Sequence, residues 1–167
     1  MTGLRSNAYL WGVAIVLFGI TLRPSAADTS SPVAAIQAAD DRWLTAYNSG
    51  DLDTVVGLYD EQAVIYPPGA RPVHGTAAIR AFFVNDNAEF LRAGLTFSIG
   101  TKRDGGVTGK WGWSSGTYTV KDKSRSVVDT GWYFSVSRNV AGKWLYVRDA
   151  WNSDGPPPQA AQAPAKK

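Results

Sequence analysis

The chain has 167 residues, of which 44% are hydrophobic and 19% are charged, so it can form one compact core but not two ordinary domains. Its formal net charge is +3, and it falls to +1 if Arg5 and Arg23 leave with an N-terminal signal. That balance leaves no basic stripe for nucleic acid, and the absence of cysteine excludes disulfides and a cysteine-linked lipid anchor.

The N-terminal segment has the pattern of an export signal. Arg5 precedes the apolar run of residues 8–22, and the small residues Ser25-Ala26-Ala27 follow where a signal peptidase reads. A membrane anchor is the alternative, but this run is shorter than the roughly 20 residues of a spanning helix. We therefore predict a signal peptide over residues 1–27, a secreted or periplasmic protein, and no membrane contact after cleavage.

The first predicted helix begins after Ser31, because serine caps helices and proline favours the first helical position. It ends at Asn48-Ser49-Gly50, which stops the pattern. Between these points, hydrophobic residues recur at helical spacing: Ile36, Ala39, Trp43 and Tyr47. This helix therefore presents an aromatic stripe.

Two more helices are predicted, with a strand between them. Asp51 can cap a short helix whose apolar face extends to Tyr59, and the extended run AVIY follows at residues 63–66. Thr76 can cap the other helix, which ends at Gly94, because glycine commonly takes the left-handed conformation at a helix end.

From Leu95 onward the hydrophobic period changes to two, which predicts strands. Turn-forming residues separate these strands at 104–106, 121–125 and 139–142. The predicted strands are residues 95–99, 107–120, 126–137 and 143–152, a meander of long antiparallel strands.

Helices followed by a continuous sheet indicate an α+β domain, which we place at residues 28–155. Three helices should cover one face of a strongly curved antiparallel sheet and leave a pocket at its wide end. Residues 156–167 contain no apolar residue larger than alanine or proline, so we predict a disordered tail there.

Four segments carry a family resemblance: AYNSGDLDTVVGLYDEQAVIYPPG, HGTAAIRAFF, GTYTV and GKWLYVRDAWNSD. They resemble the nuclear transport factor 2-like (NTF2-like) superfamily, and within it a polyketide-cyclase-like, uncharacterised group of DUF4440 type. The resemblance implies a cone-shaped fold, a hydrophobic cavity between the first helix and the sheet, and a homodimer through the outer sheet face. It does not specify the chemistry, because this fold hosts both enzymes and binding modules.

The same stretch is similar to steroid isomerases, whose general-base aspartate aligns with Tyr66. Their oxyanion-stabilising tyrosine aligns with Trp43, and their second oxyanion donor aligns with Asp129 or Thr130. A tyrosine has an ordinary pKa of about 10, which is too high for a base at neutral pH. We therefore do not predict isomerase activity from this resemblance.

Three residues are candidates for catalysis. Tyr66 can face the cavity or pack on the proline turn that follows it, and His74, the only histidine, can act as an acid or base or lie on a surface loop. Asp149 is the third candidate, by family habit. The period of two places Arg148 on the side of Trp144 and Tyr146, and Asp149 on the dimer side, unless a bulge reverses this.

The predicted ligand-binding residues are mostly aromatic: Trp43, Tyr47, Tyr66, Trp113, Tyr118 and Asn152. Neither a metal nor a cofactor is predicted, since one histidine and no cysteine make a poor ligand set. Three hypotheses remain open: a binding protein for a small, largely apolar or aromatic molecule, an acid/base enzyme such as an isomerase, cyclase or dehydratase, and a non-catalytic homodimeric association module.

Overall fold

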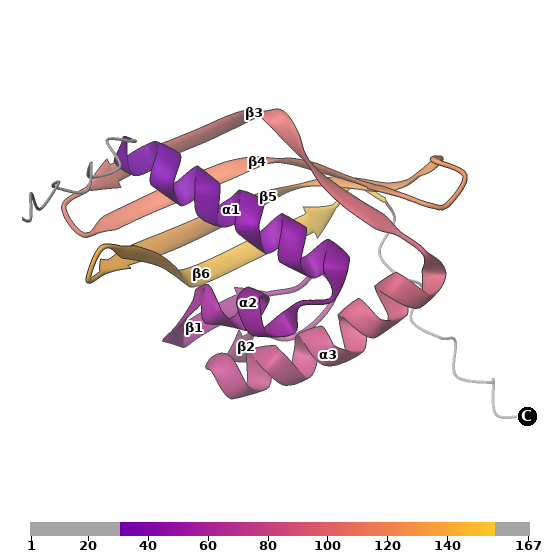
Figure 1. Cartoon of the computed structure of the whole chain (residues 1–167), viewed down its shortest axis with the longest axis horizontal. Coiled ribbons are helices and arrows are strands. Elements are labelled where there is room, and N and C mark those ends of the chain that lie inside the picture. Colours follow the sequence, from indigo (N-terminus) through magenta and orange to yellow (C-terminus); the bar gives the residue numbers. More distant parts are fainter. Residues whose placement is uncertain (1–30, 156–167) are drawn as a thin grey trace, which may run out of the picture.

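The computed structural model describes residues 31–155. The predicted signal (1–27) and tail (156–167) lie outside the described residues. Within them, three helices pack on a six-stranded sheet, and no helix is both long enough and apolar enough to cross a membrane. Figure 1 shows α1 (Pro32–Ser49) lying across the strands, and α3 (Thr76–Ala93) beside the edge formed by β1 and β2.

The helix boundaries follow the local chemistry. The Ser31 hydroxyl accepts a hydrogen bond from the Ala34 amide at 3.2 Å, and Asp51 caps α2 (Leu52–Gly57) through the Thr54 amide at 3.0 Å. Gly50 and Gly94 end α1 and α3, as predicted, and both take the left-handed conformation.

Two predicted helix limits were wrong. Thr76 is the first residue of α3 rather than its cap, because Gly75 takes the cap position with a φ of 78°. Tyr59 does not belong to the second helix but starts β1 (Tyr59–Tyr66). The α2 helix ends at Gly57, and Tyr59 pairs instead with Tyr146 of β6.

The sheet has the strand order β2-β1-β6-β5-β4-β3. Four strands form the predicted antiparallel meander, and β1 adds to it in parallel with β6, a pairing that the sequence did not suggest. The remaining bounds are β2 (Val73–His74), β3 (Thr96–Thr108), β4 (Trp111–Lys121), β5 (Val127–Val140) and β6 (Lys143–Ser153).

The turn predicted at residues 104–106 was also wrong, because these residues continue β3. Positions 105 and 106 leave little room for a side chain, because β4 comes close to both. A Cβ at Gly106 would lie 2.6 Å from the Trp113 indole nitrogen. The chain turns instead just before β4, where Gly109 has a φ of 57°. The turns predicted near 121–125 and 139–142 are confirmed.

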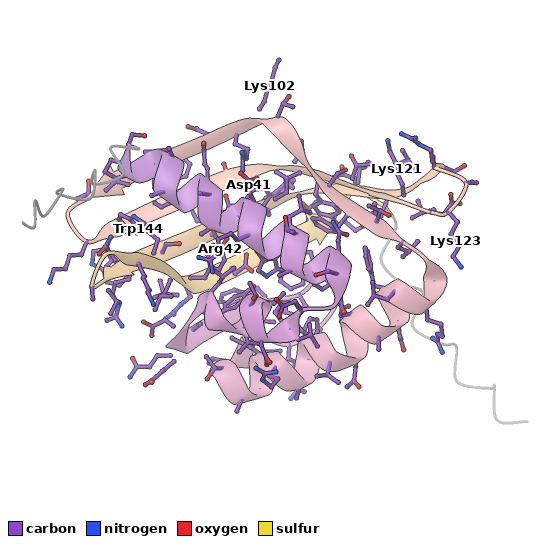
Figure 2. All side chains as sticks on the ribbon, viewed as in Figure 1. Asp41, Arg42, Lys102, Lys121, Lys123 and Trp144 are labelled. Carbon is purple, nitrogen blue, oxygen red and sulfur yellow. The ribbon has the colours of Figure 1, made fainter. Side chains whose placement is uncertain are left out.

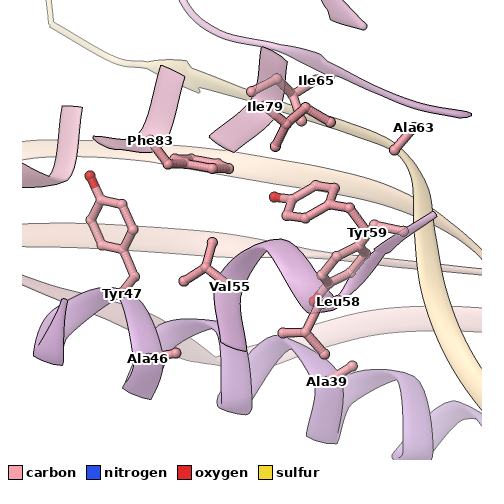
Figure 3. Close-up of a cluster of buried hydrophobic side chains, with 11 residues drawn as sticks. Ala39, Ala46, Tyr47, Val55, Leu58, Tyr59, Ala63, Ile65, Ile79 and Phe83 are labelled. Atoms are coloured by element: carbon pink, nitrogen blue, oxygen red, sulfur yellow. The ribbon is translucent and has the colours of Figure 1, made fainter. Parts of the chain in front are cut away.

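The hydrophobic core lies between the helices and the inner face of the sheet. Phe83 and Ile79 of α3 pack against Ile65 of β1, and all three are almost completely buried. Figure 3 shows Tyr59 and Phe83 facing the same space from β1 and α3. A cavity lies beside this core and shares Tyr47, Phe83 and Tyr146 with it.

Candidate functional site

A cavity of ≈ 190 Å³ lies between α1, α3 and the inner face of the sheet. Nine of its sixteen lining residues are aromatic and four are aspartates. The aromatic residues are Trp43, Tyr47, Phe83, Phe90, Phe97, Tyr118, Tyr133, Tyr146 and Trp151, and the others are Asp40, Asp86, Asp129, Asp149, Ile99, Val120 and Ser135.

Asp149 of β6 is held by a chain of two hydrogen bonds. The Tyr59 hydroxyl donates to the Asp149 carboxylate at 2.6 Å. The Trp43 indole N–H, from α1, donates in turn to the Tyr59 hydroxyl oxygen at 3.1 Å. Since indole is only a donor, it fixes the direction of this chain toward Asp149.

Burial raises the pKa of Asp149 to about 7, because the surrounding aromatic atoms remove the water that would stabilise its charge. The hydrogen bond from Tyr59 opposes this shift, and the nearby Asp40 carboxyl adds to it. Asp149 is only half-buried, so the cavity gives it access to a ligand. A carboxyl group with this pKa can both accept and donate a proton near neutral pH.

Asp40 of α1 is a second buried carboxyl group in the cavity wall, with only 3% of its surface exposed. Its oxygens accept hydrogen bonds from the Tyr146 hydroxyl at 2.7 Å and from the Ser114 and Tyr133 hydroxyls at 3.2 Å. Burial raises its pKa, and these bonds oppose the rise. Three hydroxyl groups thus hold Asp40 in place.

Two further aspartates lie where the cavity is more open to solvent. Asp86 of α3 is exposed and accepts a hydrogen bond from the Tyr47 hydroxyl. Asp129 of β5 is half-buried, with the Tyr118 hydroxyl at 2.9 Å and the Ser153 hydroxyl at 2.5 Å. We call Asp86 and Asp129 the rim carboxylates.

A β-bulge explains how Asp149 and Tyr146 both reach the cavity. Across β5 and β6, Val136 pairs with Arg148 while Ser137 pairs with Tyr146, so Val147 is an extra residue on β6. The parity argument that favoured Arg148 was therefore wrong. Arg148 is exposed and Asp149 lies on the cavity side.

Four of the predicted site residues come together in the cavity wall: Trp43, Tyr47, Tyr118 and Asp149. Asp129 or Thr130 aligned with the second oxyanion donor of steroid isomerases. Of the two, Asp129 lines the cavity and Thr130 is exposed. The aromatic stripe on the first helix is thus the feature that located this site.

The other predicted site residues are not among those that line this cavity. Tyr66 ends β1 with 41% of its surface exposed, and His74 is exposed on β2. Trp113 stacks on Phe134 with a centroid distance of 5.9 Å, and the Asn152 side chain accepts a hydrogen bond from the Trp132 amide at 3.0 Å. The turn at Pro67 and Pro68 follows Tyr66, which lies at the end of β1 rather than in this pocket.

The sequence prediction missed Asp40, Tyr59, Tyr133 and Tyr146 as site residues. Asp40 follows Ile36 by one helical turn, so it belongs to the stripe that continues to Trp43, and its spacing could have found it. Tyr59 was hidden by its assignment to the second helix. Nothing in the spacing around Tyr146 reveals the bulge at Val147.

A family model described as "SnoaL-like domain" matches residues 41–147. The chain belongs to the SnoaL-like domain family. Matching solved structures show that this SnoaL-like domain has the NTF2-like α+β fold predicted from the sequence.

One similar structure is an NTF2-like protein with a cystatin-like fold from Novosphingobium aromaticivorans, at 20% identity and a TM-score of 0.66, covering 74% of this chain and 82% of that one. Another is a ketosteroid isomerase-like protein from Erwinia carotovora atroseptica, at 19% identity and a TM-score of 0.60, covering 76% of this chain and 99% of that one. At such identities the likeness shows the fold alone.

The arrangement in this SnoaL-like domain has the features that proton transfer requires. Among residues 31–155 there is no group of three or more histidine, cysteine or acidic side chains that could hold a metal ion. The cavity instead brings a carboxyl group with a pKa of about 7 to apolar walls, the setting in which a proton can be moved on a bound molecule.

Proposed function

We propose that this SnoaL-like domain binds a small, largely apolar or aromatic molecule in its cavity and transfers a proton to or from it through Asp149. The position of Asp149 carries the proposal. It lies in an aromatic wall, accepts a hydrogen bond from Tyr59 at 2.6 Å, and has its pKa raised by burial to about 7. A general acid or base works best when its pKa is close to the working pH.

Tyr59 and Trp43 are positioning residues in this proposal. Burial and the adjacent Asp149 raise the pKa of Tyr59 well above its ordinary value, so Tyr59 keeps its proton. It can therefore hold the Asp149 carboxyl in one orientation without exchanging a proton with it. Trp43 fixes Tyr59 and also offers its ring to the ligand.

The cavity favours reactions in which the substrate develops positive rather than negative charge. The Tyr59, Tyr133 and Tyr146 hydroxyls all donate to carboxyl groups, so they are not free to stabilise an oxyanion. Carboxylates and aromatic faces both stabilise a developing cation. Loss of water from an alcohol, or a cyclisation through a cation, fits this site better than isomerisation through an enolate.

The test uses two compounds of similar size, 1-indanol and 1-indanone, incubated with the purified protein in D₂O and followed by mass spectrometry. Catalysed loss of water from 1-indanol is expected to exceed catalysed deuterium exchange into 1-indanone. Asp149→Asn should lower the active reaction by about 10²- to 10⁴-fold.

Asp53→Asn is the control, because Asp53 is exposed on α2 and pairs with Arg80 away from the cavity. This variant should react like the wild type. If the protein binds 1-indanol but neither compound reacts faster than in buffer, the domain is a binding protein and the proton-transfer half of the proposal is wrong.

We also propose that two copies of the chain associate through the outer face of the sheet. Trp111, Trp132 and Phe134 expose 51%, 51% and 39% of their surface there. Exposed apolar residues gathered on one face are typical of an association site. This proposal is independent of chemistry in the cavity, and its test is described in the Discussion.

A further inference from the structure

The four aspartates of the cavity share one pattern: each has a tyrosine hydroxyl within hydrogen-bonding distance. Tyr59 donates to Asp149, Tyr133 and Tyr146 donate to Asp40, and Tyr47 donates to Asp86. The Tyr118 hydroxyl lies 2.9 Å from Asp129 and 2.6 Å from the Asn152 carbonyl oxygen, and both groups are acceptors. These tyrosine hydroxyls thus all form hydrogen bonds with oxygen atoms of the protein.

This pattern determines what the cavity offers to a ligand. A carboxylate has about four acceptor positions, so one or two tyrosine hydroxyls leave acceptor capacity unused. The tyrosine hydroxyls, in contrast, are occupied, and the Trp43 indole N–H donates to Tyr59. A ligand in this cavity therefore meets mainly hydrogen-bond acceptors and negative charge.

No lysine, arginine or histidine is among the residues that line the cavity. Arg103 acts on the charge of Asp40 from outside the lining, but it is engaged with Asp41, whose two carboxylate oxygens lie 2.8 and 3.3 Å from its guanidinium. Figure 2 shows Lys102 pointing away from the molecule at β3, and Lys121 and Lys123 at the β4–β5 hairpin. Within residues 31–155, the charge that faces the cavity is therefore negative.

The aromatic walls point to the same ligand. Trp43 and Tyr47 stack with their centroids 4.8 Å apart, and Phe90 and Phe97 meet Tyr47 edge to face at 5.0 and 6.3 Å. The face of an aromatic ring attracts a cation, and this attraction grows when water is excluded. Aromatic rings and carboxylates together form the kind of site that binds an organic ammonium group.

We infer that the cavity selects a small molecule that joins an apolar or aromatic body to a protonated amine, and that it rejects molecules bearing a carboxylate. The apolar body packs on the Trp43 side of the cavity, and the ammonium group donates to the rim carboxylates, Asp86 and Asp129. This inference rests on the proposed cavity as the binding site and adds the charge of the ligand to it.

The test compares three molecules of nearly the same size: 2-phenylethylamine, 2-phenylethanol and phenylacetate. Binding is followed by NMR through the indole N–H signals of Trp43 and Trp151, which line the cavity, with Trp111 and Trp132 of the outer face as internal controls. The amine is expected to bind tighter than phenylacetate by at least roughly tenfold, with the alcohol between them.

The rim carboxylates are tested in the double variant Asp86→Asn/Asp129→Asn, in which each asparagine keeps an oxygen for its tyrosine partner. The preference for the amine over phenylacetate should fall by at least roughly threefold, while the affinity for 2-phenylethanol stays the same. Asp53→Asn, which removes a carboxylate far from the cavity, should leave the preference unchanged.

Equal affinities, tighter binding of phenylacetate, or an unchanged preference in the double variant would overturn the inference and leave the cavity as a neutral binding site. If none of the three molecules shifts the Trp43 and Trp151 signals, the inference and the binding half of the proposed function are both wrong.

Discussion

The two faces of β4, β5 and β6 are both rich in aromatic residues, but they differ in the partners of those residues. On the inner face, Tyr133 and Tyr146 turn their hydroxyls to Asp40 and enclose a cavity. On the outer face, Trp113 stacks on Phe134, and Trp132 is half exposed. The same strands therefore carry a polar, enclosed surface on one side and an open, apolar one on the other.

This difference shows what an aromatic residue contributes in each setting. A tyrosine beside a buried carboxyl group supplies both apolar area and the hydrogen bond that the carboxyl needs. A tryptophan on an open sheet face supplies area that stays exposed until another surface covers it. The inner face is thus suited to a small molecule and the outer face to a macromolecule.

The largest effect on stability is expected when one aromatic residue from each face is replaced by alanine. Tyr146→Ala should lower the free energy of unfolding by about 3–5 kcal/mol, because it opens a cavity in the core and removes a donor from Asp40. Trp132→Ala should cost about 1 kcal/mol or less, since half of its side chain is already in water. Urea unfolding of both variants measures the difference, and similar costs would show that the two faces are equally buried in solution.

Asp149→Asn should change the free energy of unfolding in the opposite direction, because it should stabilise the protein. The pKa of Asp149 rises from 3.8 to about 7 on folding, so the folded state binds more protons than the unfolded state between these values. Its contribution to stability therefore falls as the pH rises from about 4 to 7, and at pH 8 the wild type bears the full cost of a buried charge. The variant should then be more stable than the wild type, by an amount on the order of 1–4 kcal/mol.

Unfolding curves at pH 4.5 and pH 8 measure this prediction, with Asp53→Asn as the control for loss of an exposed carboxylate. The stabilisation by Asp149→Asn should appear at pH 8 and largely vanish at pH 4.5. An equal difference at both pH values would contradict a raised pKa at this position.

Removal of a single tyrosine hydroxyl group should have a smaller effect, which is a shift in the pKa of Asp149. Tyr59→Phe should raise the pKa of Asp149 further, because the Tyr59 hydrogen bond stabilises the charged carboxylate. Tyr133→Phe is the matched control, since its hydroxyl donates to Asp40 rather than to Asp149. Carbon-13 NMR titration of the aspartate carboxyl groups measures both, and a lowered pKa in Tyr59→Phe would show that the bond favours the neutral acid.

The fold was largely predictable because local chemistry sets its boundaries. Serine, aspartate and glycine at the helix ends act within one turn of the backbone, and the hydrophobic residues from Leu95 onward follow a period of two over most of each strand. The parallel pairing of β1 with β6 was not predictable in this way. It joins Ile65 to Asp149, residues that are far apart in the chain and have no local signal in common.

The site residues were predictable only where they lie on one face of a single helix or strand. Trp43 and Tyr47 share a helix face that the spacing reveals, whereas Asp149 and Tyr146 share the cavity only because Val147 bulges. Tyr66 and Asp149 were both predicted from family resemblance, and only Asp149 lines the cavity. A single extra residue in one strand thus decides which side chain reaches the cavity.

The smallest effect on the folded monomer concerns the outer face. Trp111→Ser/Trp132→Ser should change the stability of the monomer little, since both side chains are 51% exposed, but it should weaken the proposed self-association. Val84→Ser is the control, because Val84 is 46% exposed on α3, away from the sheet. Sedimentation velocity over a range of protein concentrations measures the association.

We expect a concentration-dependent dimer in the wild type and in Val84→Ser, and a monomer in the double variant. A wild type that stays monomeric at all concentrations would disprove association of two copies through this face. A double variant that still binds 2-phenylethylamine like the wild type would show that the two faces work independently, since the cavity is lined by side chains of the opposite face.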